Sequence, residues 1–353
     1  MLVNYYYDAL ESSEKNVYDI IQNALGNSDS ECVFSSSGLA EDGVVRAWSA
    51  VVLEHPEIIQ YPALFCFPTT VNDRVTVRFD YSSIDHAAFQ ARLDAMVDEI
   101  EQSLPLNASD YLVCKKIFDV IASKVEYDRE VERRFDEIER LRQENSRDYE
   151  TRRIEFMVQY SEAFTPYGIV MNSKGVCQGI AKLYKILCDK FGIQCACVEA
   201  TMKGENQYPH MLNVVEVSGK RAFVDATNGL INRINGLHMI SYDFFLIPAR
   251  IYDRTYLVEG DFGCTDETVN FYAKNGVWFE SLNDMKSYLC AYTVASTNGE
   301  VRCYYNGTYA NDSELSKILS DILSEHCDSA YTLEGYYVAN GFCMALVTKD
   351  KQN

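Results

Sequence analysis

A cysteine, a histidine and an aspartate occur in this chain in an order that could support nucleophilic chemistry. Cys177 follows the turn-forming pair Lys174–Gly175, His210 precedes an apolar strand pattern, and Asp225 ends a second one. A thiol becomes a strong nucleophile when a neighbouring base takes its proton, and a carboxylate can hold that base in position. These residue types therefore predict attack of a thiolate on a carbonyl carbon, a reaction that needs neither a metal nor another cofactor.

The segment that begins at Cys177 predicts a helix over residues 177–190. Its apolar residues recur at the spacing of one helix face, namely at Ile180, Leu183, Tyr184, Leu187, Cys188 and Phe191. Gly192 fits a helix C-cap, and QCACVEA predicts the strand that follows. Cys177 would then lie in the first helical turn. The partial positive charge there favours a thiolate, and the free N–H groups could stabilise an oxyanion.

The later segment HMLNVVEVSGKRAFVDATNG predicts a β-hairpin. Alternation along its first strand places His210, Leu212 and Val214 on one face, and SGK forms the turn. The hairpin brings His210 and Asp225 to matching ends of neighbouring strands. We expect Asp225 to accept the Nδ1–H of His210, which would leave Nε2 facing the thiol.

These two segments resemble the transglutaminase-like superfamily, the bacterial transglutaminase-core domains of papain-like fold. The family pattern resembles YGxLVxxKGVCxGYAxxxxxLLxxxGI followed by HxWNxVxxxGxxYxVDxTW. This chain has YGIVMNSKGVCQGIAKLYKILCDKFGI and then HMLNVVEVSGKRAFVDATNG. The resemblance implies that Cys177, His210 and Asp225 form a catalytic triad. Weaker similarity in YYYDALESSEKNVYDII, HPE, VEYD and ISYDFFLI extends it over most of the chain, toward multi-domain members from Gram-positive bacteria.

The resemblance implies a thiol-dependent acyl-transfer enzyme that acts on peptide or amide bonds of a protein or peptide substrate. Two positions depart from the family, because Leu212 and Asn228 stand where tryptophan is usual. Those tryptophans would wall the substrate groove, and a less enclosed groove favours water over an amine. We therefore expect a cysteine peptidase or amidase, with a protein-glutamine transglutaminase as the alternative.

Other functions of the same segments remain open at this stage. Tyr167, Asn172 and Gln178 are candidates for the oxyanion hole or the substrate groove because they lie close to Cys177 in the sequence. A non-catalytic interaction module that keeps the fold is a further alternative to an enzyme.

A zinc site is the remaining alternative for the cysteine-rich segment. It would use Cys188, Cys195, Cys197 and His210. The spacing of the second and third cysteines is C-x-C, which differs from the spacing usual in zinc sites. In a strand these two cysteines share one face, where free cysteine packs as a small hydrophobe. We therefore expect core packing and no metal.

The length of 353 residues fits two or three domains at roughly 150 residues each. We expect an α+β chain with a mostly helical N-terminal region (1–150), a papain-like, transglutaminase-core catalytic domain (151–258) and a small α+β C-terminal domain (259–353). In the first region, helices are expected at 5–25, 41–54, 86–104 and 109–124, and ALFCFP and VTVRFDY are expected to pair as strands. The charged stretch 129–152 is expected to be a helix. In the last region, VRCYYNG predicts a strand, SELSKILSDILSEHC a helix, and YYVANGFCMALVTK two strands.

Composition limits the partners and the compartment. The net charge of −20 disfavours nucleic acid and anionic membrane surfaces as partners. No apolar run reaches the roughly 18 residues of a membrane span. The N-terminus lacks a signal-peptide pattern and most of the 12 cysteines lie in apolar patterns, which predicts a cytoplasmic protein. A secreted or cell-envelope protein that has lost its signal is the alternative, and the oligomeric state is left open.

Overall fold

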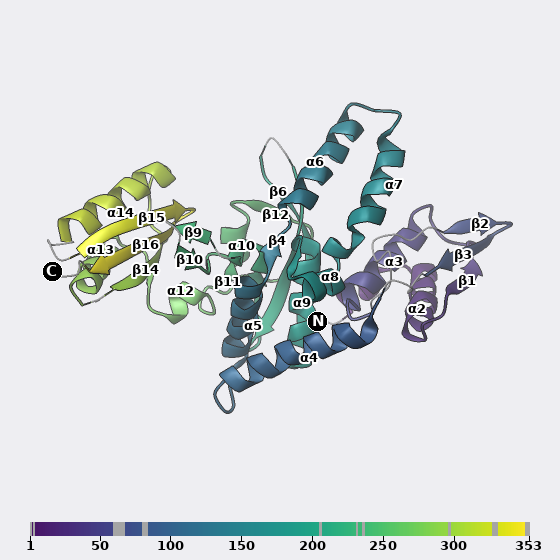
Figure 1. The fold of residues 1–353 in the computed structure, drawn as a ribbon, viewed down its shortest axis with the longest axis horizontal. Helices are drawn as coiled ribbons and strands as arrows, with labels where there is room; N and C mark the ends of the chain where they lie inside the picture. The colour runs from purple at the N-terminus through teal and green to yellow at the C-terminus, as the bar shows by residue number, and fades with distance from the viewer. Residues whose placement is uncertain are drawn as a thin grey trace.

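The computed structural model describes residues 2, 4–58, 68–79, 84–204, 207–230, 232–234, 237–295, 298–326 and 331–349. Helix makes up 51% and strand 20%, so the fold class is α+β, as predicted. The elements form an elongated arrangement, with the first elements at one end, the last elements at the other, and the sheet that carries the candidate site between them (Figure 1). None of the described helices is both long and apolar enough to cross a membrane.

The N-terminal elements form a small helical layer on a three-stranded antiparallel sheet of order β1-β3-β2. They are α1 (Tyr5–Ala9), α2 (Ser12–Gly26), β1 (Glu31–Ser35), α3 (Gly43–Glu54), β2 (Thr69–Val71) and β3 (Arg74–Arg78). The apolar faces of α2 and α3 meet the sheet in one core that includes Ile21, Trp48 and Val77. The helices predicted at 5–25 and 41–54 are thus confirmed, the first of them in two pieces. The strand predicted in ALFCFP lies outside the described residues except for Pro68.

A helical segment leads from there to the candidate nucleophile. It comprises α4 (His86–Ser103), α5 (Asp110–Lys124), β4 (Glu126–Tyr127), α6 (Arg129–Gln143), α7 (Tyr149–Tyr160), the 3-10 helix η1 (Ser161–Phe164), α8 (Pro166–Asn172), β5 (Lys174–Gly175) and α9 (Cys177–Lys190). The helices predicted at 86–104, 109–124 and 177–190 are confirmed. The charged stretch forms two helices rather than one, because the chain reverses direction between α6 and α7. This hairpin projects from the body in Figure 1.

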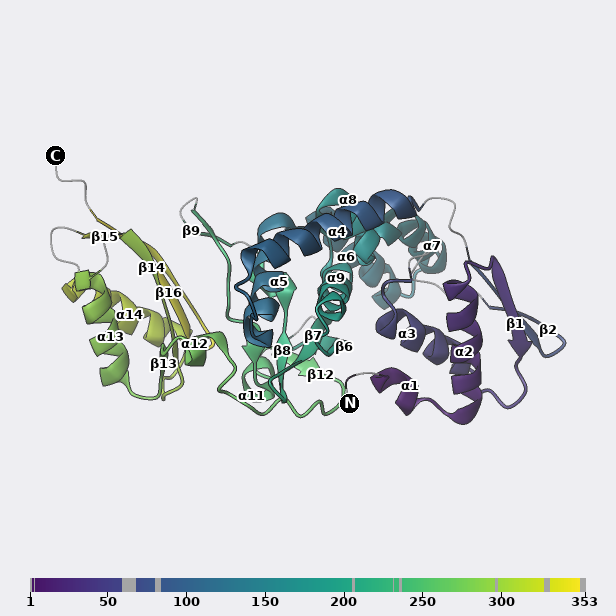
Figure 2. The ribbon, with the colours of Figure 1, turned by 90° about the horizontal axis from the view of Figure 1, so that it is seen from below.

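The central sheet is antiparallel, with strand order β11-β8-β7-β6-β12. Its region comprises β6 (Cys195–Met202), β7 (Pro209–Val217), β8 (Lys220–Val224), α10 (Ala226–Gly229), β9 (Asn232–Ile234), β10 (Leu237–Met239), β11 (Phe245–Ile247), α11 (Ala249–Tyr252) and β12 (Tyr256–Val258). The predicted hairpin is β7–β8, with Val217 opposite Lys220. Residues of α4, α5, α8 and α9 pack in one core against one face of this sheet. In Figure 2, α4 runs across α8 above this core.

The C-terminal elements form a second, four-stranded sheet of order β13-β14-β16-β15. They are α12 (Phe271–Lys274), β13 (Trp278–Phe279), α13 (Leu282–Ala295), β14 (Asn298–Tyr305), α14 (Asp312–His326), β15 (Tyr331–Ala339) and β16 (Phe342–Lys349). Buried residues of this unit join the second face of the central sheet in one core. The strands and the helix predicted here are confirmed, whereas the domain boundaries at 150 and 258 stay a prediction.

Two glycines allow η1 to lie directly against the start of α9. A Cβ on Gly179 would stand 2.9 Å from the carbonyl oxygens of both Ala163 and Thr165, and a Cβ on Gly175 would stand 2.6 Å from that of Ala163. The same Ala163 carbonyl accepts the N–H of Val176 at 3.0 Å. The glycines therefore let η1 and α9 pack closely, which fixes where the helix begins.

We expect Gly179→Ala to lower the free energy of unfolding by about 1–3 kcal/mol, because backbone oxygens must move to admit the methyl group. Gly26→Ala is the matched control, since a Cβ at that helical position meets no atom within 4 Å. It should be neutral or stabilising by up to about 1 kcal/mol. Urea unfolding of both variants measures this, and equal effects would contradict the packing argument.

Candidate functional site

The start of α9 places Cys177 at the edge of the central core. Val176 is the N-cap residue in an extended conformation, and α9 is buried along most of its length. The parallel pairing of β4 with β5 sets Tyr127 beside Gly175, two residues before the cysteine. Cys177 itself is only partly buried. Its thiol therefore combines access from outside with the free N–H groups and positive end of a helix.

His210 and Asp225 meet across the β7–β8 hairpin. Val224 lies opposite Asn213, so Asp225 follows at the end of β8, close to the start of β7. The Nε2 of His210 lies 2.7 Å from Oδ2 of Asp225, and the two side chains are 11% and 0% exposed. The predicted meeting of these two residues is found in the structure, and it is almost fully shielded from water.

The ring nitrogen that faces Asp225 differs from the prediction. We expected Nδ1 to donate to the carboxylate, but the structure places Nε2 there. The register explains the difference, because Asp225 lies beyond the Asn213–Val224 pair and His210 lies three residues before Asn213. The ring extends its distal nitrogen to reach the carboxylate. Nδ1 is then the nitrogen available to the thiol.

Four donors surround the Asp225 carboxylate. Besides His210, Oδ2 accepts from the Nδ2 of Asn228 at 2.7 Å and from the Tyr252 hydroxyl at 3.2 Å, and Oδ1 accepts the Asn228 N–H at 3.1 Å. Burial alone would raise the pKa of Asp225. The charge of His210 and the hydrogen bonds from His210 and Asn228 outweigh it and hold the pKa below its usual value. The group is therefore a carboxylate that is fixed in place.

The same contacts favour the protonated form of His210. Burial would lower its pKa, but the Asp225 charge and hydrogen bond, followed by a hydrogen bond to Cys177, raise the pKa well above its usual value. The ring also stacks on Tyr256, with centroids 4.8 Å apart and planes at 22°. His210 is thus held by the carboxylate and by Tyr256 at the edge of a cavity that Cys177 also lines.

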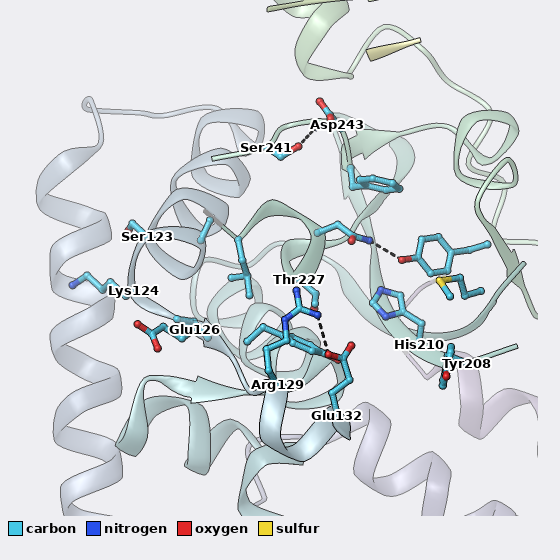
Figure 3. A pocket seen from close by; sticks show the side chains of 18 of the residues that line it. Ser123, Lys124, Glu126, Arg129, Glu132, Tyr208, His210, Thr227, Ser241 and Asp243 are labelled. Carbon is cyan, nitrogen blue, oxygen red and sulfur yellow. Dashed lines mark hydrogen bonds and ion pairs between the residues drawn. The ribbon is translucent and has the colours of Figure 1, made fainter. Parts of the chain in front are cut away.

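Two cavities meet at this histidine. The smaller, of about 580 Å³, is lined by Cys177, Gln178 and His210 among others. The larger, of about 980 Å³, contains His210, Thr227 and Asn228 and extends to Ser241 and Asp243. Figure 3 shows His210 beside Thr227, with Ser241 and Asp243 at the far end of this cavity. Tyr127, Glu132, Met202, Tyr208, Pro209 and His210 line both cavities. A groove therefore passes on both sides of the histidine.

Of the five residues predicted to line the groove, the structure brings two to it. Gln178 lines the smaller cavity and Asn228 the larger. Tyr167 is buried in the central core, where its hydroxyl accepts the Asp85 N–H at 3.2 Å. Leu212 is 1% exposed and packs in the core on the second face of the sheet.

Asn172, the fifth, ends α8 and donates to Glu162 at 3.4 Å on the exposed surface. Tyr167, Leu212 and Asn172 are not among the described residues that line either cavity. The assignment of these three to the groove is therefore not supported by the geometry. Closeness to Cys177 in the sequence did not indicate where the side chains point.

The zinc alternative uses residues that the sheet separates. Cys188 of α9 and Cys195 of β6 are buried together in the core between α9 and the central sheet. His210 belongs to the opposite face of β7 and is held by Asp225. Within the described ranges, no group of three or more His, Cys, Asp or Glu side chains could hold a metal ion.

Three tyrosines at the site, and one role of Asn228, were not predicted from the sequence. Tyr252 donates to Asp225, Tyr256 stacks on His210, and Tyr127 lines both cavities. Asn228 was expected only to replace a groove-lining tryptophan, whereas it also holds Asp225. Its position three residues after an aspartate that caps a short helix was the available signal.

Comparisons with known proteins give little beyond this geometry. A scan against protein-family models finds no match, and no curated protein sequence matches the chain. One solved structure, described as a crystal structure of a TGase, is similar to it with a TM-score of 0.31 and 14% identity. The similarity covers 48% of this chain and 45% of that chain, so less than half of that chain is matched. We therefore base the functional inference on the site itself.

The raised pKa of His210 predicts a pH-dependent stabilisation. A histidine whose folded pKa is raised stabilises the fold fully below its unfolded pKa of about 6.5, and the contribution is lost as pH rises through the folded value. Asp225, whose pKa is lowered, stays charged over this range in both states. The gap in unfolding free energy between the wild type and His210→Gln should therefore narrow as the pH rises above about 6.5. Urea unfolding measures it, and a gap that stays constant would contradict the assignment.

Proposed function

We propose that this chain is a thiol-dependent acyl-transfer enzyme that acts on peptide or amide bonds. In this proposal Cys177 is the nucleophile, His210 the base and Asp225 the residue that orients and charges the histidine. The observation that carries it is the position of His210, which is bonded to a buried carboxylate where two cavities meet, the smaller of them also lined by Cys177.

The first half of the reaction forms a thioester. His210 holds the proton of Cys177, and the thiolate attacks the carbonyl carbon of the substrate amide. The N–H groups in the first turn of α9 lie where they can donate to the resulting oxyanion, and Gln178 lines the same cavity. The tetrahedral intermediate collapses, the C–N bond breaks, and His210 gives its proton to the departing amine.

The two cavities then take different parts of the substrate. Cys177 lines the smaller cavity, so the acyl part occupies that side. The departing amine must receive a proton from His210, which also lines the larger cavity, so the amine leaves on that side. The nucleophile that resolves the thioester enters by the same route, because His210 must take its proton in turn.

Hydrolysis is the outcome we favour over cross-linking of a glutamine to an amine. The buried Leu212 no longer bears on this choice, since it packs in the core. Asn228 does, because it stands at the larger cavity with polar groups that include Thr227, Ser241 and Asp243. A polar entry holds water, whereas selection of an amine needs a site that excludes it.

We expect Cys177→Ala and His210→Ala to lower turnover of a quenched fluorescent peptide library by at least about 10³-fold. The loss of turnover in Asp225→Ala should be roughly tenfold to a hundredfold smaller than in those two variants. The nucleophile and the base act as a unit, whereas the orienting group is partly replaceable. In the wild type, iodoacetamide should label Cys177 at least about tenfold faster than the other cysteines.

Cys290→Ala is the matched control, since Cys290 and Cys177 are the two partly buried cysteines among the described ones. It should change neither turnover nor the labelling rate at Cys177, whereas His210→Ala should slow that labelling. Peptide mapping by mass spectrometry resolves each cysteine. Unchanged turnover in Cys177→Ala would exclude the proposed nucleophile.

The choice between water and an amine is tested with a glutamine peptide and a labelled primary amine. We expect deamidation of the glutamine to outpace amine incorporation, because the polar cavity admits water. Mass spectrometry separates the two products, which differ in mass. If incorporation is faster, the enzyme is a transglutaminase, and the roles of Cys177 and His210 are unaffected.

A further inference from the structure

The smaller cavity combines apolar walls with an excess of negative charge. Its apolar lining comes from α6, α7, η1, β6 and β7, and its larger apolar side chains are Phe135, Met157, Phe164, Met202 and Met211. Four carboxylates also line it, from Glu132, Asp136, Glu199 and Glu259. Its described lining includes no lysine or arginine. Such a cavity favours a ligand with a long apolar stem and a positive charge.

Two of these carboxylates face each other across neighbouring strands. β12 pairs with β6 in a register that sets Val258 opposite Ala200, so Glu259 follows opposite Glu199. Like charges at directly opposed positions of a sheet are destabilising. Partial burial and then the charge of Glu259 raise the pKa of Glu199, and the smaller effect of the Lys182 charge acts against them. No ion pair with a side chain of the described residues relieves this repulsion.

The other two carboxylates have partners within the protein. Glu132 pairs with Arg129 at 2.9 Å on the surface of α6. Asp136 takes a hydrogen bond from Tyr208, and burial followed by the charge of Glu132 raises its pKa. A cation from outside the protein would therefore be attracted most strongly at the pair of Glu199 and Glu259, because these two carboxylates have no such partner among the described residues.

The position of this pair connects it to the reaction. Glu199 is followed by Ala200, which lies opposite His210 in the β6–β7 ladder. Both glutamates line the cavity that is also lined by Cys177 and His210. We propose that they select substrates whose acyl part carries a lysine or arginine side chain next to the scissile amide. The proposal rests on the function proposed above, because it assigns the acyl part to this cavity.

The lining of the smaller cavity offers a matching surface to both parts of a lysine or arginine side chain. Its methylene groups would lie on Phe135, Met157 and Met202, while its charged end would reach Glu199 and Glu259. A cation between the two carboxylates converts a repulsion into two attractions. The recognition therefore depends on charge as well as on shape, and salt should weaken it.

Three peptidyl chloromethyl ketones that differ only in the residue beside the reactive ketone test this. The residue is lysine, norleucine or glutamate, and the rate of alkylation at Cys177 is followed by mass spectrometry in EDTA. We expect the lysine probe to react at least about fivefold faster than the norleucine probe, and the glutamate probe to react slowest. In Glu199→Gln/Glu259→Gln the advantage of lysine should fall below about twofold.

The control is Glu41→Gln/Glu101→Gln, which makes the same change in net charge at two exposed glutamates away from both cavities. It should keep the preference of the wild type. Raising the salt from about 0.05 M to about 0.5 M should reduce the lysine advantage in the wild type, and this measurement does not depend on any variant folding.

The outcomes separate the two proposals. If iodoacetamide labels Cys177 rapidly and with dependence on His210, but lysine and norleucine probes react equally, the charge selection is wrong and the catalytic assignment stands. If Cys177 is not labelled faster than the other cysteines, the proposed function fails and the selection fails with it. A lysine advantage that persists in the double glutamate variant would also overturn the selection.

Discussion

The buried carboxylate of Asp225 sets the requirements that the surrounding structure meets. A charge removed from water is costly unless it is paired and hydrogen-bonded, and this side chain is fully shielded. His210, Asn228 and Tyr252 supply that compensation from β7, from the turn after β8 and from α11. Because these groups come from separate elements, the sheet, α10 and α11 must be correctly placed relative to one another. The proton held on His210 is a consequence of the same pairing.

The cysteine is positioned by different means. Its location depends on backbone packing, in which η1 lies on the glycine-containing start of α9 and β4 pairs with β5. The result is a partly exposed thiol at a helix start that lines the same cavity as His210, whose ring is held separately by Asp225. The smaller cavity is walled in part by the α6–α7 hairpin, and the larger one in part by the residues after β8.

The charged residues have different effects in different parts of the molecule. Over the whole molecule the net charge of −20 disfavours anionic partners. Along α6, acidic and basic residues pair within the helix, so they largely cancel. At the opposed Glu199 and Glu259 the negative charges are concentrated beside the candidate nucleophile. In the proposed selection, only this last arrangement distinguishes one substrate from another, because it combines charge with a cavity of defined walls.

Local patterns in the sequence were enough to predict the helix that begins at Cys177, the β7–β8 hairpin and the α+β class. Helical spacing, strand alternation and turn residues are local properties that are expressed in the order of the amino acids. It also indicated that His210 and Asp225 would meet, because a hairpin fixes which residues are neighbours. The three-dimensional arrangement settled which nitrogen of the histidine faces the carboxylate, that Tyr252 donates to Asp225, and that Leu212 is buried. Those outcomes depend on side-chain directions and on contacts between distant segments, which no local pattern encodes.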